Sequence, residues 1–253
     1  MKSNFFIINL AVTVFLLIVL VACQPTSSQN DQTSHFEIDI SAKSEIKRIP
    51  TAKVLPIKGV DISKYQGTVD FDKLKSSGIY YIFIRATEGI TYQDPDYITN
   101  YTQAKSAGLR VGVYHFYESN DDPDAQLKNF TSLVTLGTGD LAPVIDIEKL
   151  HQQDDVDLIK NLRSFLAGLE ALYAIKPIVY TGENFANKYL STLGDYPLWL
   201  AEYEVDEPKV PVGWKDWTFW QWSQSETVDG ISGTVDVDLF NGDQAHFGKL
   251  LIK

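Results

Sequence analysis

The sequence has one cysteine, four histidines, and 22 basic against 33 acidic residues. With Cys23 as the single cysteine, no intrachain disulfide framework can form. The four histidines show no spacing typical of a His-rich metal site, so we expect no metal. A formal net charge of -11 disfavours a basic face for nucleic acid, and we expect no nucleic-acid partner.

Two sequence signatures of other enzyme classes are also missing. No glycine-rich phosphate loop follows a predicted strand, and no Gly-x-Ser-x-Gly elbow is present. We therefore expect no nucleotide cofactor and no serine nucleophile of the α/β-hydrolase type. The composition, 44% hydrophobic and 12% aromatic over 253 residues, is that of a globular protein with a sizeable core.

The N-terminal segment has the layout of an export signal. Lys2 precedes an apolar run over residues 5–22, which ends in Leu20-Val21-Ala22-Cys23. A transmembrane helix is the alternative, because this run is close to the minimum length for crossing a bilayer. The ending resembles a bacterial lipobox, so we predict a signal peptide over 1–22 and lipid attachment at Cys23, in an exported, membrane-anchored lipoprotein.

Residues 23–55 are rich in polar side chains and poor in large apolar ones, which predicts a tether. As a flexible coil of about 30 residues, it would span roughly 30 Å. Such a reach would let an anchored domain search its surroundings. The remaining residues, 56–253, are predicted to form one globular domain.

Within this domain, short β-rich runs alternate with helical periods, which is typical of βα units around a parallel sheet. Strands are predicted at 59–63, 80–86, 109–116, 142–147 and 177–181. Three more, at 197–201, 217–222 and 235–240, follow without helical periods between them. Five βα units and three strands predict an α/β fold, an irregular TIM-like barrel of (β/α)5β3 type. An open doubly wound sheet fits this count less well.

Carboxylates collect at the predicted strand ends. Asp146 and Glu148 close one apolar strand at positions i and i+2, which point to the same side. Asp61, Asp236 and Asp238 lie on two other strands. Glycosidic cleavage needs such a group, because one carboxylic acid protonates the leaving oxygen while others support the cationic transition state. Crowding raises proton affinity, so we expect Glu148 to be the protonated acid in a partly desolvated pocket.

Aromatic residues at or near the same strand ends could supply the flat faces that sugar rings stack on. Tyr114, Tyr180 and Trp199 are the better candidates for sugar contacts. Most aromatic side chains in a barrel belong to its core, so the alternative for each one is a purely structural role.

Seven segments then resemble glycoside hydrolase family 25, the Chalaropsis-type muramidases, over residues 59–241. They are DISKYQG (61–67), RATEG (85–89), GVYHF (112–116), PVIDIE (143–148), WLA (199–201), WQW (220–222) and GTVD (233–236). The resemblance implies a barrel of five βα units and three strands. It also implies a lysozyme that hydrolyses the β-1,4 bond from N-acetylmuramic acid to N-acetylglucosamine.

The resemblance assigns catalytic roles to four carboxylates: Glu148 as proton donor, Asp146 beside it, and Asp61 and Asp236 as supporting acids. It leaves open whether an enzyme carboxylate or the sugar's acetamido group attacks the anomeric carbon. Arg85 departs from the usual lysine of the family and changes the donor geometry. The predicted substrate-binding residues are Arg85, Glu88, Tyr114, Tyr180, Trp199, Trp220 and Asp238.

Two other functions remain open from the sequence: a glycan-binding protein without catalysis on the same fold, and a glycosidase of another N-acetylated polymer such as chitin. The complete set of carboxylates argues against the first. The expected partners are peptidoglycan glycan strands and, through the lipid anchor, a membrane. We expect the protein to act as a monomer.

Overall fold

The computed structural model describes residues 57–151 and 155–253. The predicted signal peptide, the lipid attachment site and the tether lie outside these residues. The described residues form nine strands: β1 Ile57–Ile62, β2 Ile79–Glu88, β3 Tyr92–Gln93, β4 Arg110–Phe116, β5 Val144–Asp146, β6 Ile178–Gly182, β7 Leu198–Ala201, β8 Phe219–Glu226 and β9 Val235–Phe240.

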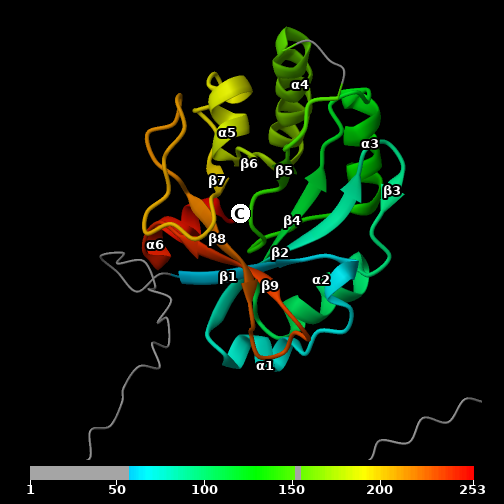
Figure 1. Ribbon diagram of the computed structural model, residues 1–253. Coiled ribbons are helices and arrows are strands. Elements are labelled where there is room, and N and C mark those ends of the chain that lie inside the picture. Colours follow the sequence, from blue (N-terminus) through cyan, green and yellow to red (C-terminus); the bar gives the residue numbers. More distant parts are fainter. Residues whose placement is uncertain (1–56, 152–154) are drawn as a thin grey trace, which may run out of the picture. The chain divides into compact units, whose positions relative to one another are not determined.

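Eight of these strands close into a barrel (Figure 1). The strand order is β1-β9-β8-β7-β6-β5-β4-β2, and β1 pairs with β2 to complete the circle, while β3 extends β2 as a short hairpin strand. Most neighbours are parallel, but β9 runs antiparallel to both β8 and β1. The predicted α/β barrel of (β/α)5β3 type is therefore confirmed.

The helices follow the first strands, as predicted, and lie outside the barrel (Figure 1). The helical segments are η1 Lys64–Gln66, α1 Phe71–Ser76, α2 Tyr97–Ser106, α3 Pro123–Leu133, α4 Asp155–Tyr173, α5 Glu183–Phe185, the π-helical turn Ala186–Leu190, α6 Gln244–Phe247 and η3 Gly248–Leu250. No helix among residues 57–151 and 155–253 is long and apolar enough to cross a membrane.

Local signals explain where several helices begin. The side chain of Asp70 accepts a hydrogen bond from Lys73 N at the start of α1, and Asp122 does the same for Ala125 N at the start of α3. Pro123 follows Asp122 in the first turn, where its missing N–H costs nothing. These caps mark where the loops that follow β1 and β4 end and the helices begin.

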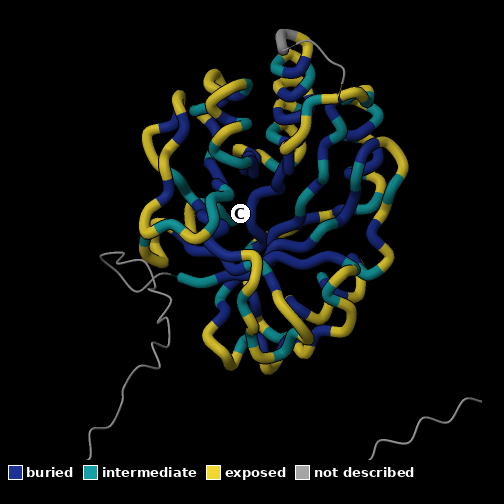
Figure 2. The backbone as a smooth tube through the Cα atoms, in the orientation of Figure 1, coloured by how far each residue is buried: buried dark blue, intermediate teal, exposed yellow. Residues whose placement is uncertain are grey.

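The apolar side chains form two layers, one between the helices and the barrel and one inside the barrel. Buried backbone follows the strands, and exposed backbone follows the outer loops (Figure 2). Inside, glycines make room for large rings: a Cβ on Gly59 would lie 2.2 Å from the Tyr81 ring, and one on Gly112 would lie 2.4 Å from Phe83. The lower interior is thereby filled with aromatic rings, and the space above them stays open.

Candidate active site

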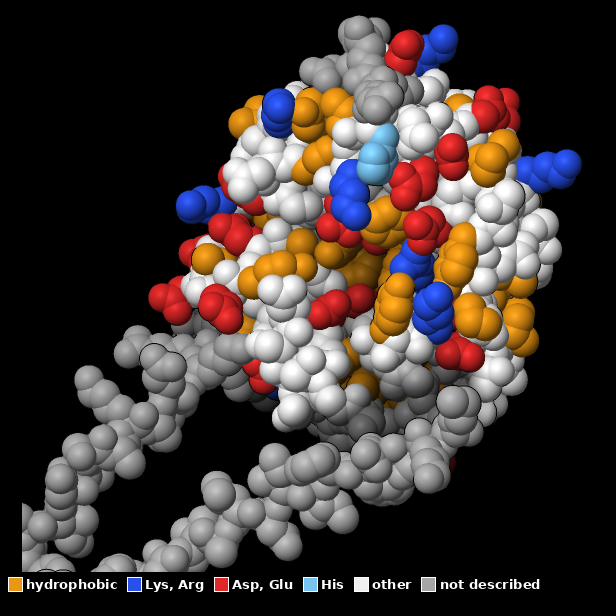
Figure 3. Space-filling model, turned by 45° about the vertical axis from the view of Figure 1, so that its right-hand side comes forward, with side chains coloured by type: hydrophobic (Ala, Val, Ile, Leu, Met, Phe, Trp, Pro, Cys, Tyr) orange, Lys and Arg blue, Asp and Glu red, His pale blue; other side chains and the backbone are white. Residues whose placement is uncertain are grey.

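A cavity of about 240 Å³ opens at the carboxyl ends of the barrel strands, where chemistry collects in this kind of fold. Figure 3 shows a hollow on this face, with hydrophobic side chains inside it and acidic and basic ones around it. The residues that line the cavity are Asp61, Ile62, Ser63, Tyr65, Gln66, Arg85, Tyr114, Phe116, Asp146, Glu148, Tyr180, Trp199, Gln221 and Asp236.

The four carboxylates predicted to be catalytic all line this cavity. Asp61 closes the inner face of β1, Asp146 is the last residue of β5, Glu148 follows it, and Asp236 lies at the start of β9. Strand alternation directs Asp61, Asp146 and Asp236 inward, and Glu148 lies just beyond the end of β5. The sequence spacing therefore predicted which carboxylates come together, while their catalytic roles remain to be tested.

Asp146 and Glu148 differ in depth. Asp146 is 6% exposed, and burial, followed by the charge of Glu148 and a hydrogen bond with it, raises the pKa of Asp146 well above its ordinary value. Oδ1 of Asp146 is buried, and no described residue donates to it. Glu148, two residues further along, is exposed at the mouth. The expected desolvation of Glu148 is thus wrong for this state of the protein, because β5 ends at Asp146.

Burial also affects the two supporting acids, Asp61 and Asp236. Burial raises the pKa of Asp61 well above its ordinary value, and the charge of Asp236 raises that pKa further. Burial and then the charge of Glu148 raise the pKa of Asp236 to about 6. The cavity therefore retains protons at a pH where exposed aspartates have lost theirs.

Gln221 connects the two sides of the cavity, and the sequence analysis did not select it. Its Oε1 accepts hydrogen bonds from Tyr180 Oη at 2.7 Å and Tyr203 Oη at 2.6 Å, and its Nε2 donates to Asp61 Oδ2 at 2.6 Å. The last bond opposes the rise in the Asp61 pKa. The sequence offered one signal for Gln221, namely its place between the two tryptophans of the WQW segment. Side chains alternate along a strand, so Gln221 faces the cavity when both tryptophans face the helices.

The same alternation corrects the prediction for Trp220. Trp220 is 1% exposed, packs in the layer outside the barrel, and donates from Nε1 to the backbone oxygen of Glu202. It does not line the cavity, because Gln221 occupies the inward position on β8. Direct contact between Trp220 and a glycan is therefore excluded in this conformation.

Trp199 forms the floor of the cavity. Its ring stacks on Phe83 with centroids 4.2 Å apart and meets Tyr180 edge-on at 4.5 Å. Its Nε1 donates to Asp238 Oδ1 at 2.8 Å. Asp238 is fully buried below this floor and does not line the cavity, so the prediction that it binds substrate directly is also wrong.

The remaining predicted contacts lie on β2 and β4. Tyr114 lines the cavity, as does Arg85, which forms an ion pair with Glu88. Glu88 lies beyond the cavity lining and contacts it only through Arg85. A glycan in the cavity would therefore reach Arg85 and Tyr114 directly, and Glu88 through Arg85.

His115, the histidine that falls at a predicted strand end, faces the helices. It is fully buried, bonded through Nδ1 to Thr87 Oγ1 at 2.7 Å and through Nε2 to Gln126 Oε1 at 3.1 Å. Burial lowers its pKa to about 4, so it is neutral at physiological pH. Across the described part of the chain, no group of three or more His, Cys, Asp or Glu residues is arranged to hold a metal ion.

This chain is similar in sequence and in fold to known proteins. The family model of glycosyl hydrolases family 25 matches residues 60–231. The autolytic lysozyme of Clostridium acetobutylicum is 38% identical over 73% of this chain, which spans 56% of that protein's length. Lysozyme M1 of Streptomyces globisporus is 31% identical over 84% of this chain and 77% of its own length.

A solved lysozyme structure has a similar fold. The bacterial lysozyme from Streptomyces coelicolor superimposes with a TM-score of 0.75 at 31% identity, over 78% of this chain and 98% of that one. The segments that resemble the family in sequence contribute Asp61, Arg85, Tyr114, Asp146, Glu148, Trp199, Gln221 and Asp236 to the cavity lining. The chain therefore belongs to glycosyl hydrolases family 25.

Proposed function

We propose that the protein is a lysozyme that hydrolyses the β-1,4 bond between N-acetylmuramic acid and N-acetylglucosamine in peptidoglycan. The observation that carries the proposal is the convergence of Asp61, Asp146, Glu148 and Asp236 on one open, aromatic-floored cavity. Family membership and two relatives named as lysozymes support it. Aromatic faces suit sugar rings, and carboxylates suit an oxocarbenium-like transition state.

Glu148 is the group best placed to donate the proton. It lies at the cavity mouth, within hydrogen-bonding reach of Asp146, so a proton held by this pair can pass to the departing sugar oxygen. Bound glycan would cover Glu148 and remove the water that surrounds it in the free protein. Asp61 and Asp236 then stabilise the positive charge that develops at the anomeric carbon.

The free Oδ1 of Asp146 favours the substrate's acetamido group as the attacking group. A buried acceptor without a donor is costly, and the acetamido N–H of the sugar would satisfy it. In this route the acetamido oxygen bonds to C1 as the C1–O bond breaks and Glu148 protonates the leaving oxygen. Water then opens the oxazolinium at C1, and the configuration is retained.

Product analysis tests the bond that is cut. Mass spectrometry of digested peptidoglycan should show muramic acid at the new reducing ends. Reducing-end glucosamine would identify a different bond, and binding without any new reducing ends would favour a non-catalytic glycan-binding protein. Faster release of sugar from chitin than from peptidoglycan would favour the chitin alternative.

The attacking group has its own test. Peptidoglycan strands with de-N-acetylated muramic acid should bind but not be hydrolysed, because an amine cannot form the oxazolinium. Equal turnover of acetylated and de-N-acetylated strands would assign the attack to an enzyme carboxylate instead.

For the N-terminal segment we propose export, lipid attachment at Cys23 and a tether to residue 55. The support is the lipobox-like ending of the apolar run and the polar composition that follows it. Cys23→Ser should release the protein from membranes or block its processing, as cell fractionation would detect. A processed variant that stays with the membranes as the parent does would contradict this proposal. We also propose that the protein acts as a monomer.

A further inference from the structure

One side of the cavity mouth carries cations that alternate with aromatic rings. Lys64 Nζ and the guanidinium of Arg85 both lie 5.2 Å from the centroid of Tyr92. Arg85 is also 5.3 Å from the centroid of Phe116, and Lys149 Nζ is 5.5 Å from that same ring. We call these five residues the basic wall.

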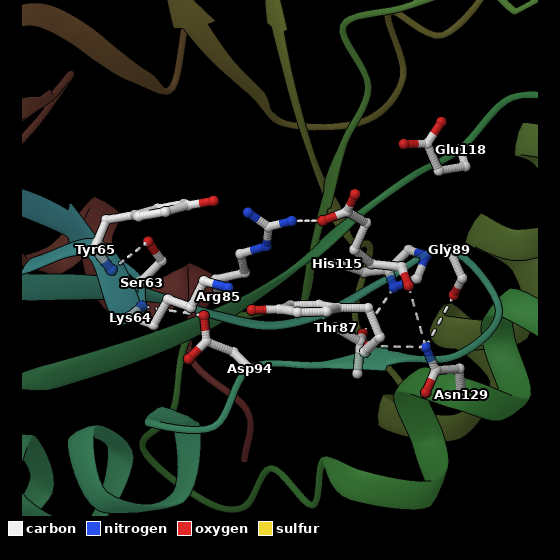
Figure 4. Close-up of polar contacts among 12 residues, drawn as sticks. Ser63, Lys64, Tyr65, Arg85, Thr87, Gly89, Asp94, His115, Glu118 and Asn129 are labelled. Atoms are coloured by element: carbon white, nitrogen blue, oxygen red, sulfur yellow. Dashed lines mark hydrogen bonds and ion pairs between the residues drawn. The ribbon is translucent and has the colours of Figure 1, made fainter. Parts of the chain in front are cut away.

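The basic wall is held in place from several directions. The turn at Lys64 is capped by the side chain of Ser63, and Asp94 Oδ2 accepts a hydrogen bond from Lys64 N at 3.1 Å (Figure 4). Asn129 Nδ2 donates to the backbone oxygen of Gly89 (Figure 4). It also donates to the backbone oxygen of Tyr92 and so fixes the loop that carries the Tyr92 ring. The cations are therefore presented on an ordered surface.

The charges of the wall are only partly used within the protein. Arg85 forms an ion pair with Glu88, but its Nε is buried with no acceptor among the described residues. Neither Lys64 nor Lys149 makes an ion pair with a carboxylate in the described part of the chain. In a protein with a net charge of -11, unpaired lysines beside a substrate cavity are available for an anion.

Peptidoglycan strands and chitin differ in whether they carry an anionic group. N-acetylglucosamine is neutral, whereas every muramic acid carries a lactyl group that ends in a carboxylate or continues into a peptide stem with carboxylates of its own. The Arg85 side chain is only 14% exposed, which strengthens its attraction for a carboxylate, and the rings hold Lys64 and Lys149 on either side of it. A polymer of N-acetylglucosamine alone would offer these cations no partner.

We propose that the basic wall binds a carboxylate carried by the muramyl side chain of the glycan strand. The inference rests on the proposed lysozyme function and adds the substrate group that is recognised. Lys64 and Lys149 act as specificity-determining residues on either side of Arg85. A carboxylate bound there orients the muramyl residue in the cavity beside Asp146 and Glu148.

The test compares substrates that differ only in this charge. Glycan strands without peptide stems are used as such and after conversion of their lactyl carboxylates to methylamides, and kcat/KM is measured at low salt. The parent should favour the carboxylate form by about tenfold, and added salt should reduce that preference. A parent that cleaves both forms equally well excludes the lactyl carboxylate as the ligand. The inference is overturned if, in addition, the lysine variant described below keeps the parent's kcat/KM on strands that retain their peptide stems, and the lysozyme function then stays intact. Absence of new reducing ends from any strand would instead refute the function.

Two double variants locate the effect. Lys64→Gln with Lys149→Gln should bring the ratio of the two kcat/KM values close to one. Lys128→Gln with Lys249→Gln removes the same charge at exposed positions on α3 and η3, and should keep the parent's ratio. If the parent discriminates between the two forms and the first pair discriminates equally, the wall does not bind the lactyl carboxylate.

Strands that retain their peptide stems identify the source of the carboxylate. A loss of kcat/KM in the lysine variant that is confined to stem-bearing strands assigns the contact to the stem. A loss confined to stem-free strands assigns it to the lactyl group. Either result supports the inference, and thermal melts of both variants should match the parent's because these lysines are at the surface.

Discussion

The lower and upper halves of the barrel interior are built by the same strands and have opposite chemistry. On β2, Phe83 lies in the lower half and Arg85 in the upper half; on β8, Phe219 lies below Gln221. The lower rings pack against one another at centroid distances of 4.2 to 5.6 Å, whereas the upper side chains surround an open cavity. Two residues along a strand therefore separate the stabilising part of the barrel from its reactive part.

The two halves also differ in their effect on stability. Burial of aromatic rings is favourable at about 25 cal/mol per Å² of apolar surface removed from water. Burial of carboxylates is unfavourable to their charged form, as the raised pKa values of Asp61, Asp146 and Asp236 indicate. We infer that the aromatic half holds the acidic half in a geometry that the carboxylates alone would not maintain.

The sharpest way to separate the halves is to remove the proposed acid in the upper one. Glu148→Gln keeps the size of the side chain but has no proton to transfer, so turnover should fall by about 10²–10⁴-fold. Because Glu148 is exposed, the thermal transition should stay where it is. Assays of reducing ends together with thermal melts measure both.

Glu170→Gln is the matched control for this prediction. Glu170 lies on α4, outside the barrel, and its substitution should change neither rate nor stability. A Glu148→Gln variant that hydrolyses peptidoglycan near the parent's rate would show that Glu148 is not the acid.

The lower half should respond in the opposite way. Phe83 is fully buried and stacked on Trp199, so Phe83→Ala should lower the free energy of unfolding by about 3–5 kcal/mol through the cavity it leaves. Denaturant titration measures the loss. Ile98→Ala, at a side chain 56% exposed on α2, should change it by no more than about 0.5 kcal/mol. Equal effects of the two changes would mean that the aromatic half does not stabilise the barrel.

Asp236 offers a pH-dependent test of the cost of the upper half. The pKa of Asp236 is about 6 in the folded protein against an ordinary value of 3.8. Protonation of Asp236 therefore stabilises the folded state; this contribution is complete below pH 3.8 and is lost as the pH rises through 6. Asp236→Asn removes the charge, so the melting temperature of the variant should exceed the parent's at pH 7 and match it near pH 3.5. Turnover should fall at the same time. A gain that is largest at acidic pH would reverse the sign and refute the argument.

Sequence periodicity predicted the barrel well because each strand buries both faces and each helix only one. The pair Asp146 and Glu148 was predicted from the side-chain period of a strand, and both line the cavity although β5 ends at Asp146. The short strand β3 could not, because its two residues carry no pattern.

The sequence could not show which side chain of a strand faces the cavity, or how deeply each carboxylate is buried. Trp220 and Gln221 are neighbours, and only the register of β8 decides which one faces the cavity. Glu148 and Asp146 are both acidic, and only the end of β5 decides which one is buried. Both features depend on pairing between strands, which a single sequence does not reveal.

Asp238 lies where the two halves meet, and substitutions there should have smaller effects than Glu148→Gln has on turnover or Phe83→Ala on stability. It is fully buried, accepts from Trp199 Nε1, and has no described partner for Oδ2. Burial, and then the charge of Asp61, raise its pKa well above its ordinary value, which favours a neutral carboxyl group. Asp238→Asn keeps a neutral group of the same shape and an oxygen for Trp199, so stability should change by only about 1 kcal/mol. Asp238→Ala leaves Trp199 without its acceptor and should cost about 1–3 kcal/mol, raising KM more than it lowers kcat as the cavity floor loosens. If Asp238→Asn were as damaging as Asp238→Ala, the charge of Asp238 and not its hydrogen bond would be what the floor requires.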